Sequence, residues 1–331
     1  MSMVFMISGE WNNLQEITGY SGCTPDTAYK RTGNYGLKLS GSASYLYKAF
    51  TPLSEAYLQV AWLVGTGSAP NFTSFSLRNG TTSLISVARN TSNLLEIRSG
   101  WGGTLLATGI TPLLNNTWYV IELHYRLADV NGVAELRVDG NLECTFTGDT
   151  KPGAETAFDQ FYVSGAYLAA NNTYIDDVVL NDLNGSVNNS WPGGLKLALL
   201  KPNAEGGTQE WTAVPGPAHY TAVDEVPPSG TDCVKTDQVD RLELFGLEDL
   251  PTEAQSVKAV ALDFHGLKGS TVAPTRVAQV VNLGGTNYVQ ADQDLPMAQG
   301  LVRKILDQNP TGGNWSVAAV NALVAGVKSR P

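Results

Sequence analysis

The stretch that decides the fold reads YIDDVVLNDLNGSVNNSWPGG and covers residues 174–194. Residues 174–180 are mostly aromatic, aliphatic and β-branched, which is typical of a strand. The residues after them are rich in Asn, Asp, Gly and Ser and end in Trp-Pro-Gly-Gly, which is typical of a linker. This pattern predicts that one β-sandwich closes at the strand and a second begins after the linker, with domains over residues 1–185 and 186–331.

Composition agrees with two domains built mainly of strands. The chain has 331 residues, of which 43% are hydrophobic, and this is enough for two ordinary cores. Charged residues make up 16% and glycines number 34, which suits many short strands joined by tight polar turns. We therefore predict an all-β fold of two antiparallel β-sandwich (jelly-roll) domains.

The charge balance bears on the partners of the protein. Lys and Arg number 21 and Asp and Glu 31, so the net charge is −10 at pH 7. Such a chain is repelled by nucleic acid and by anionic membranes, and no stretch is long and apolar enough to span a bilayer. We expect neither a nucleic-acid partner nor membrane insertion. The first residues lack the features of a signal peptide, so we expect a protein that stays soluble in a cytoplasm.

The clearest strand signal runs over residues 118–126. Tyr119, Ile121 and Leu123 fall on one face of this strand, while Glu122 and His124 fall on the other. Alternation continues over 134–138 and 142–146, with Asn-Gly and Asp-Gly turn signals between the runs. These residues predict a meander of three strands. A cross-strand acid such as Glu135 is a sufficient partner for His124.

The second half carries weaker strand signals and one helix signal. Ser316 precedes an apolar run that ends at Gly326, which predicts one short capped helix. Residues 301–306 fit a helix or a strand equally well. The Pro-rich segment 215–228 predicts a long loop that contacts a partner or a neighbouring subunit. Strands are predicted over residues 195–200, 209–212, 233–235, 240–247, 257–265 and 276–283.

No motif for catalysis is found in the sequence. The chain contains no G-x-S-x-G elbow, no H-E-x-x-H, no G-x-x-x-x-G-K and no alternating run of acids of the kind that sugar cleavage needs on a strand. We therefore expect no enzymatic activity and no catalytic residue. Cys23, Cys144 and Cys233 are widely spaced and odd in number, so they predict buried apolar side chains rather than disulfides or a zinc site.

Three carboxylates form the candidate metal site. Glu10 together with Asp176 or Asp177 resembles the early-strand Glu and late-strand Asp that hold a structural calcium at the sheet edge of many carbohydrate-binding sandwiches. Calcium needs six to eight oxygen ligands, so backbone carbonyls would supply the rest. The alternative is that these carboxylates cap turns. Because Asp176 and Asp177 are adjacent on a strand, they are expected to point to opposite faces. No cofactor is required.

Trp101 is the candidate glycan-binding residue. It lies in Ser-Gly-Trp-Gly-Gly, where glycines on both sides leave little cover for an indole. Sugar rings stack on exposed Trp and Tyr side chains, which makes such a residue a candidate contact. The alternative is a turn residue that folds back on the core. Trp62 and Trp118 are expected in the core, and Trp191 and Trp315 between elements.

With these residues in view, two parts of the chain resemble known families. Residues 117–119 (TWY), 138–140 (VDG) and 174–177 (YIDD) resemble the concanavalin A-like, laminin-G-like jelly roll, over about residues 5–185. The remainder is similar to the tail half of a group of tailed-bacteriophage virion proteins, through residues 188–193 (NNSWPG), 209–212 (QEWT), 223–225 (VDE), 309–316 (NPTGGNWS) and 325–328 (AGVK).

The resemblance implies a non-enzymatic structural protein of the virion, either a capsid decoration or a tail-fibre or tail-associated protein. It implies assembly in the host bacterial cytoplasm, partners among the other virion proteins, self-association as a trimer, and a host-surface glycan as ligand. The absence of fibrous repeats favours a compact attached knob over a fibre shaft. The alternative is a secreted carbohydrate-binding or glycoside hydrolase-like module.

Overall fold

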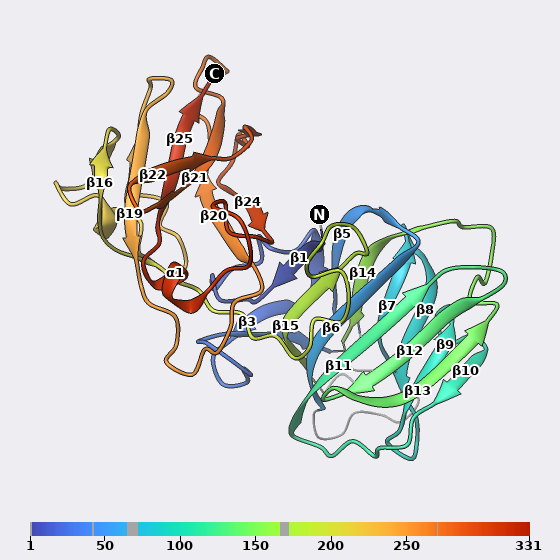
Figure 1. Ribbon diagram of the computed structural model, residues 1–331. Helices are drawn as coiled ribbons and strands as arrows, with labels where there is room; N and C mark the ends of the chain where they lie inside the picture. Colours follow the sequence, from blue (N-terminus) through green and yellow to red (C-terminus); the bar gives the residue numbers. More distant parts are fainter. Residues whose placement is uncertain (1, 42, 65–71, 166–171, 270) are drawn as a thin grey trace. The chain divides into compact units, whose positions relative to one another are not determined.

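The computed structural model describes residues 2–41, 43–64, 72–165, 172–269 and 271–331 (Figure 1). In these residues, strands are the main regular structure, and the helices are the short α1 (Val317–Asn321) and the 3-10 turn η1 (Tyr220–Ala222). The expected all-β fold class is confirmed. The chain divides into two compact units, Met1–Leu197 and Ala198–Pro331, and each is described by itself.

Two antiparallel sheets build the first unit, and they lie in two layers in Figure 1. Sheet A has the order β13-β12-β11-β6-β15-β4-β3, and β1 also pairs with β15. Sheet B has the order β10-β9-β8-β7-β14-β5-β2. The strands of sheet A are β1 (Met3–Ile7), β3 (Cys23–Asp26), β4 (Gly36–Ser40), β6 (Glu55–Val64), β11 (Thr117–Arg126), β12 (Gly132–Val138), β13 (Asn141–Gly148) and β15 (Asn172–Asn181). Those of sheet B are β2 (Gly19–Ser21), β5 (Tyr45–Leu53), β7 (Phe72–Asn79), β8 (Thr82–Arg89), β9 (Leu95–Ser99), β10 (Leu105–Thr108) and β14 (Phe158–Ser164).

The core of the first unit lies between these sheets. On β11, Ile121, Leu123 and Tyr125 are buried and pack in the same cluster as Phe161 of β14. Each such side chain contributes about 1.5–3 kcal/mol when it is fully buried. Strands β11, β12 and β13 pair in sequence order, so the predicted meander is confirmed. The alternation that predicted it works because only one face of this sheet meets the core.

The second unit is built on a sheet of order β16-β19-β25-β21-β22, with β23 also on β21. Two separate pairs accompany it, β17 with β18 and β20 with β24. The β20–β24 pair packs on the sheet through Leu262 and Leu306, which share a buried cluster with Val281 and Trp315. The strands are β16 (Pro202–Gln209), β17 (Thr212–Val214), β18 (Cys233–Lys235), β19 (Leu242–Leu247), β20 (Val260–Gly266), β21 (Arg276–Leu283), β22 (Thr286–Val289), β23 (Gln293–Asp294), β24 (Gly300–Leu306) and β25 (Val324–Arg330).

The predicted helix exists but ends earlier than expected. The Ser316 hydroxyl accepts a hydrogen bond from the Ala319 N–H at 3.1 Å and caps α1, as predicted. The helix ends at Asn321, because the chain then enters β25 and pairs with β19 and β21. Gly326 belongs to this strand, where a Cβ atom would overlap the carbonyl of Glu243. The ambiguous segment 301–306 is a strand.

The segment 195–200, which was predicted to be a strand, has no strand pairing. Backbone N–H groups at Leu195 and Leu197 bond to side chains of the first unit instead of to a neighbouring strand. These bonds explain why the division between the units falls after Leu197, beyond the boundary at 185/186 that the sequence indicated.

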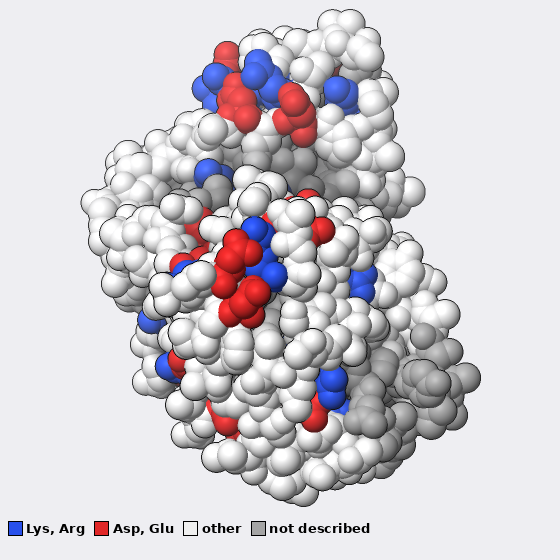
Figure 2. All heavy atoms as spheres, turned by 90° about the vertical axis from the view of Figure 1, so that its right-hand side faces the viewer, with Lys and Arg blue, Asp and Glu red and all other residues white. Residues whose placement is uncertain are grey.

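The three cysteines are free, and the charged side chains lie in small groups on the surface (Figure 2). Cys23 is buried and Cys144 and Cys233 are partly buried, and all three are free thiols. Burial raises the pKa of the Cys23 thiol to about 12. Within the described residues, no helix is long and apolar enough to cross a membrane. On the face drawn in Figure 2, acidic and basic side chains lie in small clusters of mixed sign with uncharged surface around them.

Candidate functional site

The outer surface of sheet B carries a group of tyrosines. Tyr45 and Tyr47 alternate with Leu46, which is fully buried, so both tyrosines face away from the core. Tyr162 of β14 faces the same way, because its neighbours Phe161 and Val163 are buried and it lies directly opposite Tyr47 in the register. Strand alternation and register therefore bring three tyrosines together on one outer face.

The three rings stand nearly parallel to one another. The ring centroids of Tyr45 and Tyr162 are 5.8 Å apart, with an interplanar angle of 15°. Those of Tyr45 and Tyr47 are 6.5 Å apart, with an angle of 18°. The Tyr47 ring lies over Gly19 of β2, where any side chain would overlap it. A glycine at this position of the edge strand thus makes room for the ring.

Arg78 of β7 extends the row of rings. Its guanidinium carbon lies 3.2 Å from the centroid of the Tyr162 ring and 4.9 Å from that of Trp101. Its Nε–H donates to the Ser76 hydroxyl at 3.1 Å, which fixes the plane of the group. Stacking between a cation and an aromatic face contributes about 0.5–2 kcal/mol, more as water is excluded.

Trp101 lies across the end of this row. Its ring meets Tyr162 edge to face, with centroids 5.6 Å apart at 84°, and the side chain stays 43% exposed. The turn that carries it is held by the Ser86 hydroxyl, which donates to the Gly100 carbonyl at 2.6 Å, and by the Gly100 N–H, which donates to Leu84. Gly100 has φ +73°, a conformation that favours glycine. Trp101 therefore packs on the outer face of sheet B and not on the core.

We call Tyr45, Tyr47, Arg78, Trp101 and Tyr162 the aromatic face. Of its members, the sequence singled out only Trp101. The alternation Tyr-Leu-Tyr at residues 45–47 was a usable signal for two more, since it places both rings on one side of a strand. Tyr162 and Arg78 join them only through the strand register.

The three carboxylates that the sequence proposed as calcium ligands are all buried, with Glu10, Asp176 and Asp177 at most 3% exposed. Glu10 accepts hydrogen bonds from two consecutive backbone N–H groups, at Asn34 and Tyr35. This arrangement matches the alternative drawn from the sequence, in which such carboxylates cap turns.

Asp176 and Asp177 do not point to opposite faces in the structure, contrary to the expectation from strand alternation. Asp177 has φ +46°, and the pairing of β15 with β6 shifts register between Asp176 and Val179. At this point the strand that pairs with β15 on its other side changes from β4 to β1. As a result both carboxylates reach Arg31 and Thr32. Asp176 accepts hydrogen bonds from the backbone N–H groups of these two residues. Asp177 accepts one from the Arg31 guanidinium at 2.6 Å and one from the Thr32 hydroxyl at 2.9 Å.

The neighbouring cation and the small number of clustered acids argue against calcium at these carboxylates. The Arg31 guanidinium occupies the place beside Asp177 that a metal ion would take. Within the described residues, no group of three or more His, Cys, Asp or Glu side chains could hold a metal ion. Burial, together with the charge of Asp177, raises the pKa of Asp176. The residues present do not fit a calcium ion, and we assign no role to one.

Buried polar side chains instead form hydrogen bonds to the backbone of the last residues of the first unit. Asp177 accepts the Leu197 N–H at 2.7 Å, and Glu122 accepts the Gly193 N–H at 2.7 Å. The Gln59 amide bonds to both the N–H and the carbonyl of Leu195, at 2.8 and 2.9 Å. We call these contacts the linker clamp: the side chains of Gln59, Glu122 and Asp177 with the backbone of residues 193–197.

His124 has a different partner from the one expected. Its ring bonds to Glu55 at 2.8 Å and stacks on Tyr57 at 4.2 Å. Glu135 lies directly opposite His124 in the register but pairs with Arg137. His124 bonds to Glu55 because β6 pairs with β11 on the side away from β12 and brings Glu55 close to the ring.

The remaining tryptophans serve packing, as the sequence indicated for most of them. Trp62 is buried and Trp118 is half-buried. The Trp191 ring packs edge to face on Tyr57 and lies 4.0 Å from the Arg137 guanidinium. In the second unit, the Trp315 indole N–H donates to the Leu306 carbonyl at 2.9 Å inside the core.

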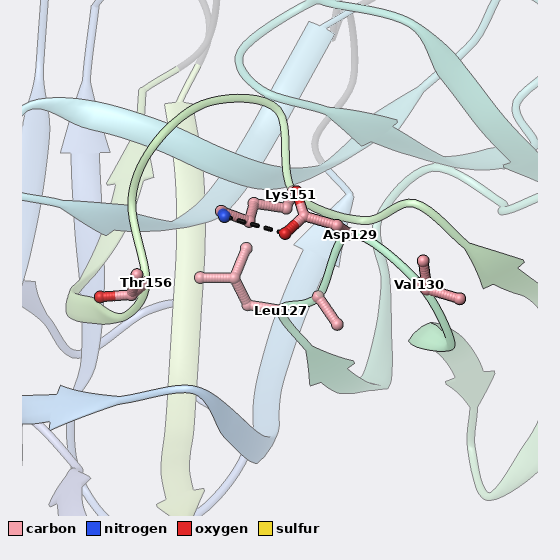
Figure 3. A pocket seen from close by; sticks show the side chains of 6 residues that line it. Leu127, Asp129, Val130, Lys151 and Thr156 are labelled. Carbon is pink, nitrogen blue, oxygen red and sulfur yellow. Dashed lines mark hydrogen bonds and ion pairs between the residues drawn. The ribbon is translucent and has the colours of Figure 1, made fainter.

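A surface pocket and a partly buried His–Glu pair are two further places where polar side chains meet. A shallow pocket of about 420 Å³ is lined by residues 127–130, Lys151 and Thr156 (Figure 3). Its ion pair joins Lys151 to the exposed Asp129 at 3.0 Å, and no nucleophile with an adjacent base lines it. In the second unit, His219 bonds to the buried Glu243 at 2.7 Å, and Glu243 also accepts the Trp211 N–H. This pair fixes the chain around β17 and is not joined to a nucleophile among the contacts described.

No protein-family model matches the chain, and no curated protein matches it. Among solved structures, it is similar to a carbohydrate esterase from a Shiga toxin-encoding bacteriophage, with 15% identity and a TM-score of 0.42 over 55% of this chain and 99% of that one. It is also similar to a cellulose-induced protein, with 14% identity and a TM-score of 0.39 over 53% of this chain and 89% of that one. A third similar structure is an alginate lyase, with 10% identity and a TM-score of 0.39 over 55% of this chain and 98% of that one. At these identities and scores, none of these activities is assigned to the chain.

Proposed function

We propose that the protein is a non-enzymatic structural protein of a bacteriophage particle and that the aromatic face binds glycan. The observation that carries the binding site is Trp101, which is 43% exposed and lies beside Tyr162 on the outer face of a sheet. Sugars present apolar ring faces that stack on such side chains, while hydroxyl groups reach nearby polar atoms.

Arg78 borders the rings and stacks on Tyr162, where its guanidinium can meet sugar hydroxyls. Ser76 and Ser86 lie on the same side of sheet B but are fully buried, and their hydroxyls bond to Arg78 and to the Gly100 carbonyl. They therefore support Arg78 and the turn that carries Trp101. One such site is weak on its own, but many copies on one particle raise the effective affinity by about 10²–10⁴.

The placement on the particle is supported by the resemblance of residues 188–193 and of the second half to phage virion proteins. We propose a location on the capsid, as a decoration, or on the tail. Its partners are then other virion proteins and further copies of the chain, with a trimer as the expected assembly. Imaging of purified particles from the phage that encodes the chain tests this placement, and absence of the protein from those particles would refute it.

Replacing Trp101 tests the binding site. We expect Trp101→Ala to weaken binding to an immobilised array of oligosaccharides by about tenfold or more, because a central aromatic contact contributes about 2 kcal/mol or more. Tyr20→Ala is the matched control. Tyr20 is 52% exposed but lies opposite the buried Leu46, so it does not belong to the aromatic face. Equal effects of the two substitutions would contradict the site.

A further inference from the structure

We infer that the glycan held by the aromatic face carries an anionic group, a carboxylate or a sulfate, which binds the Arg78 guanidinium. The inference rests on the proposed function, since it names the class of saccharide for the same site. It goes beyond stacking by assigning a charge to the ligand.

Arg78 has no acidic partner among the described residues. The side chains nearest its guanidinium are Tyr162, Trp101 and Ser76, none of which carries a negative charge at neutral pH. Three other arginines of the first unit have carboxylates beside them: Arg31 with Asp177, Arg98 with Glu96, and Arg137 with Glu135. Arg89 and Arg126 bond to neutral amide and carbonyl oxygens, whereas Arg78 lies against aromatic rings.

The surroundings of Arg78 withdraw it from water without neutralising it. The side chain is half-buried between two aromatic rings, and this burial lowers the pKa of its guanidinium. A cation that has lost part of its hydration and has no counter-ion is costly, and an anion supplied by a ligand offsets that cost.

The orientation of the guanidinium suits a carboxylate or a sulfate. Its Nε–H donates to Ser76 and the guanidinium is also within hydrogen-bonding reach of the Tyr162 side chain, which leaves its remaining N–H groups for a ligand. Such N–H groups form paired, charge-assisted hydrogen bonds with planar or tetrahedral anions. An acidic sugar with its ring on Trp101 or on the tyrosines would bring its anionic group within reach of Arg78.

The charge of the whole chain makes this contact selective. A net charge of −10 repels polyanions at long range, so attraction to an acidic glycan must come from a short-range contact. Arg78 is the cation on the aromatic face that supplies one. We therefore expect recognition of single acidic sugars next to a stacked ring, and not general adhesion to anionic polymers.

The test uses the full-length protein on an array of neutral, uronic-acid and sulfated oligosaccharides. We expect binding to members of the uronic-acid or the sulfated class at least about tenfold tighter than to their neutral counterparts, since a charge-assisted hydrogen bond of this type accounts for a tenfold change or more. The array separates a carboxylate from a sulfate as the preferred group. Trp101→Ala should weaken binding to acidic and neutral sugars alike.

Variants of Arg78 separate charge from structure. Arg78→Gln should reduce binding of the acidic saccharides by about tenfold more than it reduces binding of the neutral ones, because both classes lose the stacked side chain but only the acidic class loses the ion pair. Arg78→Lys keeps the charge but loses the paired geometry, so it should retain part of the preference. Arg137→Gln is the matched control, because Arg137 already pairs with Glu135 and lies on sheet A. Far-ultraviolet dichroism and the melting temperature check that each variant is folded.

The possible failures are distinct. Neutral sugars bound as tightly as acidic ones, with both lost in Trp101→Ala, would overturn the anionic preference and leave glycan binding in place. An equal loss of acidic and neutral binding in a folded Arg78→Gln or Arg78→Lys variant would make Arg78 a support for the rings and would also overturn the inference. Absence of binding to every saccharide on the array would refute the proposed glycan binding together with the anionic preference.

Discussion

Asp177 illustrates how one backbone angle changes the chemistry of a side chain. With φ at +46° it leaves the regular alternation of β15, so its carboxylate and that of Asp176 both reach Arg31 and Thr32. An aspartate tolerates this conformation better than most residues, because its short polar side chain can bond locally. The sequence indicated that these acids matter but could not indicate the bulge, which arises from pairing with β6.

Glu122 gives a prediction about pH. Burial raises the pKa of this carboxyl, so the folded chain binds the proton more tightly than the unfolded chain does. Its contribution to stability is therefore fully present below the unfolded pKa of about 4.3 and is lost as the pH rises through the folded value. Glu122→Gln keeps an oxygen for the Gly193 N–H and removes the ionisation.

We expect the Glu122→Gln variant to lose less stability between pH 4 and pH 8 than the unchanged protein does. Chemical denaturation at both pH values measures the difference. Glu135→Gln is a suitable comparison, because Glu135 is on the neighbouring strand β12, where it pairs with the partly exposed Arg137. A Glu122→Gln variant with the same pH dependence as the unchanged protein would contradict the assignment.

At the scale of elements, strands with one buried face were predictable and segments held by side chains were not. Residues 118–126 alternate in sequence because one face of β11 meets the core, and Ile121, Leu123 and Tyr125 are buried there as predicted. Glu122 on the opposite face is buried as well, because residues 193–197 cover it. Segment 195–200 has a strand-like composition, but its N–H groups bond to Gln59 and Asp177 and not to a strand. Tyr162 joins Tyr47 through register, which local pattern does not encode.

The linker clamp predicts a large effect from one substitution. Asp177→Ala removes the acceptor for Arg31, Thr32 and the Leu197 N–H, and leaves a cation without its counter-ion. We expect a loss of about 3–5 kcal/mol in the free energy of unfolding of the first unit. Urea denaturation followed by tryptophan fluorescence measures it.

Asp129→Ala serves as the control for that experiment. Asp129 forms an ion pair with Lys151, but its side chain is 70% exposed. Exposed pairs of this kind contribute about 1 kcal/mol or less. Similar losses in the two variants would show that Asp177 is no more important than a surface acid.

At the scale of the whole molecule, composition and turn signals predicted an all-β chain in two parts, and the structure has two compact units built mainly of strands. The boundary was the part that composition could not locate. A linker composition begins after residue 180, but the chain stays attached to the first unit as far as Leu197, because the side chains that hold it come from β6, β11 and β15.

Truncation tests this boundary. A fragment of residues 1–197 should be more stable than one of residues 1–185 by more than about 3 kcal/mol, because the shorter fragment loses the hydrogen bonds of Gln59, Glu122 and Asp177 to residues 193–197, at about 1–3 kcal/mol each. Thermal and chemical denaturation of the two fragments measure the difference. Equal stabilities would mean that residues 186–197 do not belong to the first unit.

The linker clamp also sets where a pulling force would enter the first unit. Asp177 lies on β15, which has β6 on one side and β4 and β1 on the other, so the chain leaves from the middle of sheet A and not from an edge. If the first unit holds a surface while the second is anchored, tension along the chain reaches the hydrogen bonds at Leu197, Leu195 and Gly193 first. Load then spreads into three neighbouring strands together, and no terminal strand is peeled away one bond at a time.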